Sequence, residues 1–244
     1  MIINFKKPNI ICFLLFIVCF LFLVSSAKSQ SPETGIALTW TADTYVPLNY
    51  PGKALPTRKS AIEVVATINN LNINPEELIY YWFVNDRIKD NGSRKGNQVF
   101  EFELSEALSQ ITTVRVKAKD QRGNPIAESN YLVIKPSQPE IIIQTDAPFL
   151  IGERLIPEYQ ISANQEVKFT ARPYFFKVER PDELDYEWNV VGKTSQKDNG
   201  ENSNILVLKI SQVVDYIEQT LTAWVKNSYT FEKGQASVKL LLRP

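Results

Sequence analysis

Histidine is absent from the 244 residues of this sequence, and cysteine occurs only at Cys12 and Cys19. Without histidine the chain lacks the usual general base near neutral pH and the commonest metal ligand. Both cysteines lie in an N-terminal apolar run, so removal of that run would leave no thiol for a disulfide, a nucleophile or a metal site. These absences predict a non-enzymatic protein with no cofactor and no metal.

An excess of charge of one sign is also missing, because 27 lysines and arginines balance 27 aspartates and glutamates. A neutral chain has no basic surface to follow a phosphate backbone, so nucleic acid is not an expected partner. The sequence has no glycine-rich phosphate loop and no Cys-x-x-Cys motif. Its loop carboxylates lack the dense spacing of a calcium loop, and nothing singles out a carboxylate pair for glycoside cleavage.

The longest apolar run lies at the N-terminus. Lys6 and Lys7 precede Ile10–Val24, which is apolar throughout, and Ser25–Ser29 then supplies small residues. This order of basic, apolar and small residues is typical of a secretory signal peptide. Residues 1–29 are therefore predicted to direct export to the cell surface, the extracellular space or the periplasm.

The fate of this segment is open between cleavage and anchoring. Cleavage could follow Ala27 or Ser29, since both end a small-x-small pattern. The apolar run extended to Ala27 has 18 residues, the lower limit for crossing a bilayer, so an uncleaved signal anchor is the alternative. In either case the membrane would be contacted only through this segment.

Four segments of the remaining chain recur in the same order at offsets of 106 to 108 residues. The matched pairs are 80–84 with 186–190, 100–105 with 206–211, 116–119 with 223–226, and 132–136 with 240–244. Duplication of one module explains such a constant offset. We expect two domains, at residues 34–136 and 141–244, joined by a proline-containing linker at residues 137–140.

Within both halves, apolar residues alternate with polar ones. Examples are residues 62–68, 100–104, 114–119, 167–172 and 238–243. This period of two predicts antiparallel strands with one face on a core, and turn signals separate the strands. The expected fold is all-β, with two tandem antiparallel sandwiches after the N-terminal hydrophobic helix. Only Ser105–Gln110 and Ser211–Glu218 keep a helical period, which predicts a helical turn in each.

Residues 80–82 and 186–188 share the pattern Tyr-x-Trp. The pattern resembles the core strand of PKD-like and other immunoglobulin-like domains, in which a tryptophan fills the middle of the sandwich. The resemblance implies an immunoglobulin-like fold with Trp82 and Trp188 in the two cores. From residue 36 onward the chain also resembles two-module exported proteins of uncharacterised bacteria, in the segments Trp40–Pro47 and Arg172–Phe176.

Trp224 differs from the other repeat tryptophans because it shares parity with Thr222 and Lys226 on the polar side of its strand. Its counterpart in the first repeat is Lys117. An indole on the outer face of a sheet is a candidate contact for a ligand or a partner. The alternative is that Trp224 only covers its own sheet beside neighbouring aliphatic stems.

Tyr45 and Tyr50 are weaker binding candidates, in the proline-rich segment Tyr45–Lys59. Its three prolines prevent pairing as a regular central strand. The segment could guard a sheet edge or recognise a partner.

Together these features predict an exported structural or interaction protein. The expected partner is another envelope protein or a surface polysaccharide. Two alternatives stay open: a carbohydrate-binding or enzyme accessory module, and a membrane-anchored subunit of an envelope assembly.

Overall fold

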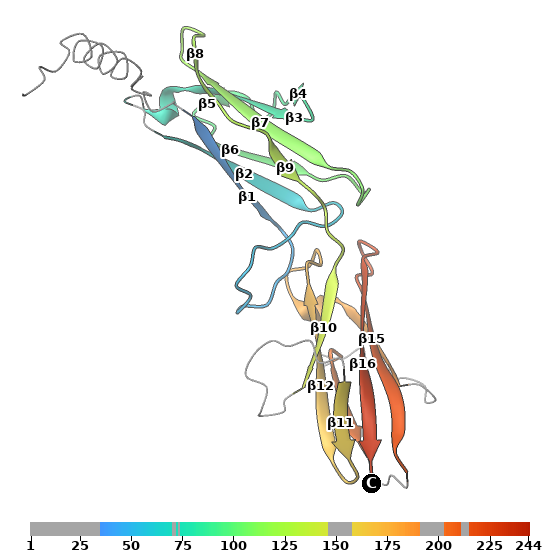
Figure 1. The fold of residues 1–244 in the computed structure, drawn as a ribbon. Helices are drawn as coiled ribbons and strands as arrows, with labels where there is room; N and C mark the ends of the chain where they lie inside the picture. The colour runs from blue at the N-terminus through green and yellow to red at the C-terminus, as the bar shows by residue number, and fades with distance from the viewer. Residues whose placement is uncertain (1–34, 70–71, 73, 146–157, 191–202, 211–214) are drawn as a thin grey trace, which may run out of the picture. The chain divides into compact units, whose positions relative to one another are not determined.

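A computed structural model describes residues 35–69, 72, 74–145, 158–190, 203–210 and 215–244. These residues form strands, turns and two short 3-10 helices (Figure 1). No helix among them is long and apolar enough to cross a membrane. The predicted signal or anchor segment, residues 1–29, lies outside the described residues.

The first sandwich consists of two sheets. One has the strand order β1-β2-β6, and the other has the order β4-β3-β7-β8, with β5 paired to β3 and β9 paired to β7. All pairings between these strands are antiparallel. The bounds are β1 Ile36–Ala42, β2 Ala61–Ile68, β3 Ile79–Val84, β4 Arg87–Ile88, β5 Arg94–Lys95, β6 Val99–Glu103, β7 Thr112–Lys119, β8 Pro125–Glu128 and β9 Leu132–Ile134.

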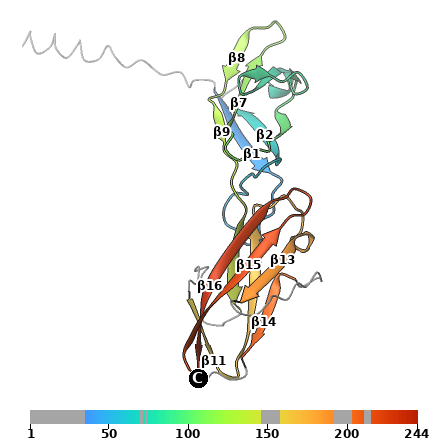
Figure 2. The same cartoon turned by 90° about the vertical axis from the view of Figure 1, so that its right-hand side faces the viewer.

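The second sandwich also has two sheets, with the orders β10-β12-β14 and β11-β16-β15-β13. Figure 2 shows β16, β15 and β13 as neighbours in one sheet. Its strands pair antiparallel except for β11, which runs parallel to β16. The bounds are β10 Glu140–Thr145, β11 Glu158–Ser162, β12 Glu166–Tyr174, β13 Asp185–Val190, β14 Ile205–Lys209, β15 Ile217–Lys226 and β16 Lys233–Arg243.

The two sandwiches share one topology. In each, the strands at the first, second and fifth positions of an immunoglobulin sandwich form one sheet. The strands at its third, sixth and seventh positions form the other sheet. On this basis β1, β2, β3, β6 and β7 correspond to β10, β12, β13, β14 and β15. The duplication seen in the sequence therefore has a counterpart in strand order.

Each sandwich has its own hydrophobic cluster, and no described residue belongs to both. The alternating positions supply these clusters. In the first, Ile62, Val64 and Ala66 of β2 are buried, and their neighbours face away. In the second, Val167 and Phe169 of β12 are buried, and the residues next to them in the strand are more exposed. The period-two prediction is confirmed in these strands, whereas residues 240–242 near the end of β16 are all buried.

The tryptophan of each sandwich is held by the same hydrogen bond. Trp82 Nε1 donates to the Asn97 carbonyl at 3.0 Å, and Trp188 Nε1 donates to the Ser203 carbonyl at 3.1 Å. Both tryptophans are buried. The acceptors are 106 residues apart, the same offset that separates the tryptophans. The repeat thus preserves an acceptor that no side-chain pattern identifies, since any residue can supply a carbonyl.

A tyrosine two residues earlier makes a second conserved pairing. Tyr80 Oη donates to the Pro75 carbonyl at 3.2 Å, and Tyr186 Oη donates to the Pro181 carbonyl at 2.9 Å. These carbonyls begin the 3-10 helices η2 (Pro75–Glu77) and η3 (Pro181–Glu183). Each helix is therefore tied to the strand that follows it.

Burial raises the pKa of both tyrosine hydroxyls above the ordinary value, and nearby negative charge adds to the shift at Tyr186. A raised pKa in the folded state means that stability is complete below the unfolded pKa of about 10 and falls as the pH rises beyond it. At neutral pH we expect Tyr186→Phe to cost about 1 kcal/mol through the lost hydrogen bond. Between about pH 9 and 11 the difference in unfolding free energy between the wild type and Tyr186→Phe should shrink, because only the wild type loses stability as the tyrosine ionises in the unfolded state. Urea unfolding of both proteins at each pH measures it, and a constant difference would contradict the expectation.

One of the two predicted helical turns is wrong, and the other lies partly outside the described residues. Within Ser105–Gln110 there is a single hydrogen-bonded turn, closed by Gln110 N donating to the Ala107 carbonyl, and no helix. In Ser211–Glu218, residues 211–214 lie outside the described residues, and 217–218 begin β15. Six to eight residues offer too few turns for a helix to form without a packed apolar face. The short helices occur instead before β3 and β13, where a proline starts each.

Candidate functional site

The outer face of β13, β15 and β16 carries Trp224 at the centre of a cross-strand row. Glu187 of β13 lies opposite Trp224, and Gln235 of β16 lies opposite it on the other side. All three side chains are exposed. Opposed residues in an antiparallel sheet have Cβ atoms about 5 Å apart, so these side chains are direct neighbours.

A second row lies two residues along the strands. Asp185 is opposite Lys226, and Lys226 is opposite Lys233. Ser228 Oγ, beyond the end of β15, donates a hydrogen bond to Asp185 Oδ2. The two rows therefore combine an indole, an amide, two carboxylates and two ammonium groups on one face.

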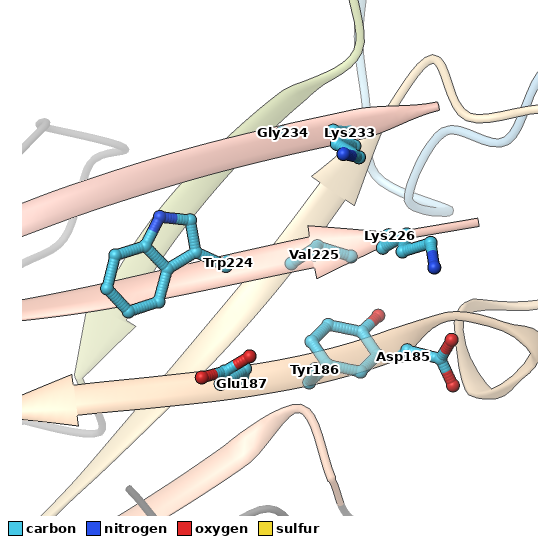
Figure 3. Close-up of a pocket in the computed structure, with 8 residues that line it drawn as sticks. All are labelled: Asp185, Tyr186, Glu187, Trp224, Val225, Lys226, Lys233 and Gly234. Atoms are coloured by element: carbon cyan, nitrogen blue, oxygen red, sulfur yellow. The ribbon is translucent and has the colours of Figure 1, made fainter. Parts of the chain in front are cut away.

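The two rows border a hollow of about 320 Å³. Figure 3 shows the Trp224 indole and the Glu187 carboxylate toward one end, and the Asp185 and Lys226 side chains toward the other. The volume is at the lower limit for pockets that hold small ligands, about 300–1,000 Å³. The eight residues that line the hollow are Asp185, Tyr186, Glu187, Trp224, Val225, Lys226, Lys233 and Gly234.

The Trp224 side chain is 38% exposed. Its Nε1 donates a hydrogen bond of 3.0 Å to Gln235 Oε1, which restrains the ring. An indole held in this way offers an apolar surface without first losing rotational freedom on binding. Gln235 and Glu187 are part of the site, but the sequence analysis did not identify them. Their positions depend on the registers of the β13–β15 and β15–β16 pairs, which connect residues far apart in the sequence.

The hairpin tip, Asn227–Glu232, adjoins the charged end of the hollow. Glu232 is buried, and its Oε2 accepts hydrogen bonds from Lys177 N at 3.0 Å, Asn227 Nδ2 at 3.2 Å and Thr230 Oγ1 at 2.7 Å. Its Oε1 has no hydrogen-bond partner among the described residues. Asn227 Oδ1 in turn accepts from the backbone N–H of Tyr229 at 2.9 Å. The tip is thus built on an internal polar network.

Two aromatic side chains project from this tip, since Tyr229 is 88% exposed and Phe231 is 67% exposed. Phe231 has φ 60°, in the left-handed region that side chains other than glycine seldom occupy. Its N–H donates to the Asn227 carbonyl at 2.9 Å, which helps to hold this conformation. Residues 227–232 contain no glycine, the residue that usually marks a hairpin turn, so the sequence gives no signal for this tip.

The corresponding face of the first sandwich also borders a hollow, of about 410 Å³, which residues of β7 and β8 line, but the charged groups there are paired. Lys117, the counterpart of Trp224, lies opposite Glu128, and its Nζ is 3.1 Å from Glu128 Oε2. Arg115 Nη1 lies 2.6 Å from Oε1 of the same carboxylate. The Arg115 guanidinium also lies over the Phe83 ring, with 5.0 Å between its Cζ and the ring centroid. Burial raises the pKa of Glu128, but the hydrogen bonds from Lys117 and Arg115 outweigh it and lower that pKa overall.

Tyr45 and Tyr50 are not among the residues that line the hollow, and both contact the end of β12. The Tyr45 N–H donates to the Phe176 carbonyl at 2.8 Å, and the Tyr45 carbonyl accepts from Phe175 N at 2.7 Å. The Tyr50 ring meets Tyr174 edge-on at 5.5 Å and Phe175 at 5.8 Å between centroids. Both tyrosines are half-buried. The structure therefore does not bring them together with Trp224.

Lys177 extends this contact region. Its Nζ donates to the Lys59 carbonyl and lies 3.6 Å from Asp43 Oδ2. The loop from Asp43 to Lys59 is thereby attached at both ends to residues 174–177. Of the two roles predicted for the proline-rich segment, these contacts favour the structural one.

No group of three or more carboxylate or thiol side chains that could hold a metal ion occurs among the described residues. Asp120, one of the loop carboxylates, instead accepts hydrogen bonds from the Asn124 side chain and backbone and from Arg122 N. These bonds, led by that from the Asn124 side chain, lower the pKa of Asp120. This carboxylate closes a turn. Asp198 lies outside the described residues.

No protein-family model matches the sequence, and no curated protein matches it either. The three N-terminal domains of the bacteriophage RB49 highly immunogenic outer capsid protein Hoc align with 86% of this chain at 15% identity and a TM-score of 0.43. The alignment spans 59% of the Hoc chain, less than two thirds of its length.

Two further solved structures are similar over the same extent. Fibronectin(III)-like modules of Clostridium thermocellum CbhA align with 84% of this chain and 94% of theirs, at 14% identity and a TM-score of 0.29. The FN1–FN3 domains of chicken CNTN1 align with 86% of this chain and 67% of theirs, at 11% identity and a TM-score of 0.30. The fold assignment rests on the strand order and the cores described above.

Proposed function

We propose that this chain is an exported, non-enzymatic binding protein, and that the outer face of β13, β15 and β16 is its binding surface. The supporting observation is the contrast between Trp224 and Lys117. Lys117 occupies the matching place in the first sandwich and is paired with Glu128. Trp224 is restrained by Gln235 but leaves its ring available beside a hollow.

The expected partner is another envelope protein or a surface polysaccharide. A partner of either kind would gain affinity from covering a fixed indole, and specificity from the charged and amide groups around it. A hollow with groups of both charge signs also adjoins Lys117, so the restrained and exposed indole is the feature that distinguishes the face around Trp224. This is the reason to prefer a binding role over a purely structural one.

Site-specific photo-crosslinking tests the proposal. A photoreactive amino acid replaces Trp224 in one variant and Lys117 in a second variant. Each variant is expressed in cells that have their native envelope. The expected result is one saturable adduct, with protein or polysaccharide, from position 224 and not from position 117. Equal adducts at both positions, or none at 224, would refute the binding surface. Hydrolysis of a glycan or peptide bond by the purified protein would refute the non-enzymatic role.

Export is the second part of the proposal, and it rests on Lys6, Lys7 and the apolar run Ile10–Val24. A mature mass that lacks residues 1–27 or 1–29 would establish cleavage. An intact mass in the membrane fraction would instead favour the anchored subunit of an envelope assembly. An intact chain in the cytoplasmic fraction would contradict export.

A further inference from the structure

We infer that the hollow beside Trp224 binds a neutral polysaccharide, with one pyranose ring stacked on the indole. The inference rests on the proposed function, because it names the ligand class of the same surface. It follows from three properties of the site: the orientation of the indole, the balance of the charges, and the pairing of the backbone beneath them.

The aromatic platform comes first. A pyranose ring has an apolar face of C–H groups, and this face packs on the π surface of an indole. Trp224 has the exposed area for such a contact, and the hydrogen bond to Gln235 keeps the ring from rotating away. The platform is thus preorganised for a flat, weakly polar surface.

The charges around the platform select against a charged ligand. Asp185 and Glu187 contribute two carboxylates, and Lys226 and Lys233 contribute two ammonium groups, so the formal charge of the lining is zero. Carboxylates only accept hydrogen bonds and ammonium groups only donate them. Sugar hydroxyls do both, so a neutral sugar can use every one of these groups.

The strand that carries Trp224 favours recognition through side chains over pairing with a peptide. An extended peptide takes much of its affinity from main-chain hydrogen bonds to a sheet edge. Strand β15, which carries Trp224, is paired on both sides, to β13 and to β16. Its backbone groups are already used in the two ladders, so recognition above Trp224 has to come from side chains.

The first sandwich shows what happens when these properties are absent. At the matching place, Lys117 and Arg115 are both paired with Glu128. No indole stands there, and the carboxylate already has two basic partners. The first sandwich therefore provides a matched control within the same chain. Lys117 shows that a lysine is compatible with this position of the repeated module.

The test uses the full chain and four neutral oligosaccharides, the hexamers of glucose, mannose, galactose and N-acetylglucosamine, in titration calorimetry. At least one is expected to bind. Trp224→Lys should weaken binding at least about tenfold, and Trp224→Tyr by only about threefold, because a tyrosine ring still stacks. Lys117→Ala should leave the affinity unchanged. Near-identical circular dichroism spectra confirm that each variant is folded.

Three outcomes would overturn the inference: no binding to any of the four, binding that Trp224→Lys leaves intact, or tighter binding of polygalacturonate or of a proline-rich peptide. The photo-crosslinking experiment separates this failure from that of the proposed function. A protein adduct at position 224 without glycan binding would keep the binding surface and reject the sugar. Absence of both would reject the two proposals together.

Discussion

Replacing Trp188 with alanine is expected to lower the free energy of unfolding of the second sandwich by about 3–5 kcal/mol. The side chain is 2% exposed and is part of the main cluster of that sandwich. Its loss would leave a large cavity among close-packed neighbours, and the carbonyl of Ser203 would lose its buried donor. Trp82→Ala should cost the first sandwich a similar amount, since Trp82 is fully buried in the equivalent place.

The two variants control for each other. Hydrogen exchange resolved along the chain would report each sandwich separately. The two clusters share no described residue, and the described contacts between the sandwiches join the loop Asp43–Lys59 to residues 174–177. We therefore expect Trp188→Ala to lower the free energy of opening measured by exchange much less in the first sandwich than in the second. Equal loss of protection in both sandwiches would show that they unfold as one cooperative unit, and would contradict two independently folding domains at residues 34–136 and 141–244.

Replacing Glu232 with alanine should destabilise the β15–β16 hairpin tip and cost about 3 kcal/mol. Glu232 Oε2 accepts from Lys177 N, Asn227 Nδ2 and Thr230 Oγ1. Alanine would leave these donors without their acceptor in a region from which water is largely excluded. The exposed aromatic residues Tyr229 and Phe231 depend on this network for their conformation.

Glu232→Gln is the matched control, because it retains one acceptor oxygen of similar geometry. We expect it to cost less than the alanine variant, and urea unfolding measures both. Hydrogen exchange of residues 227–232 should rise most in Glu232→Ala. If the alanine variant were as stable as the wild type, the network would have no role in holding the tip.

Much of the fold could be predicted from local patterns. The alternation in β2, β7 and β12 identified both the strands and their buried faces, because side chains along a strand point to opposite sides. The Tyr-x-Trp pattern and the constant offset identified the repeat. Strand ends and short turns were harder to predict. Ser211–Glu218 has the apolar spacing of a helix, but its last two residues begin β15.

The candidate site was only partly predictable. Parity placed Trp224 on the polar side of its strand, and the structure finds it exposed there. Its neighbours Glu187 and Gln235 come from two other strands, and their positions depend on register. A shift of one residue would have placed different side chains beside the indole. Tyr45 and Tyr50 were weaker binding candidates in the sequence, and they pack against the end of β12.

The sequence by itself determined the all-β composition, the duplicated module, the buried tryptophan pair and the absence of histidine chemistry. These follow from composition and from periodicities that act over a few residues. Only the tertiary structure decided which groups surround Trp224, that its counterpart Lys117 is paired with a carboxylate, and where Glu232 lies. Those properties arise from contacts between residues distant along the chain, and pairing register and packing create them when the strands assemble.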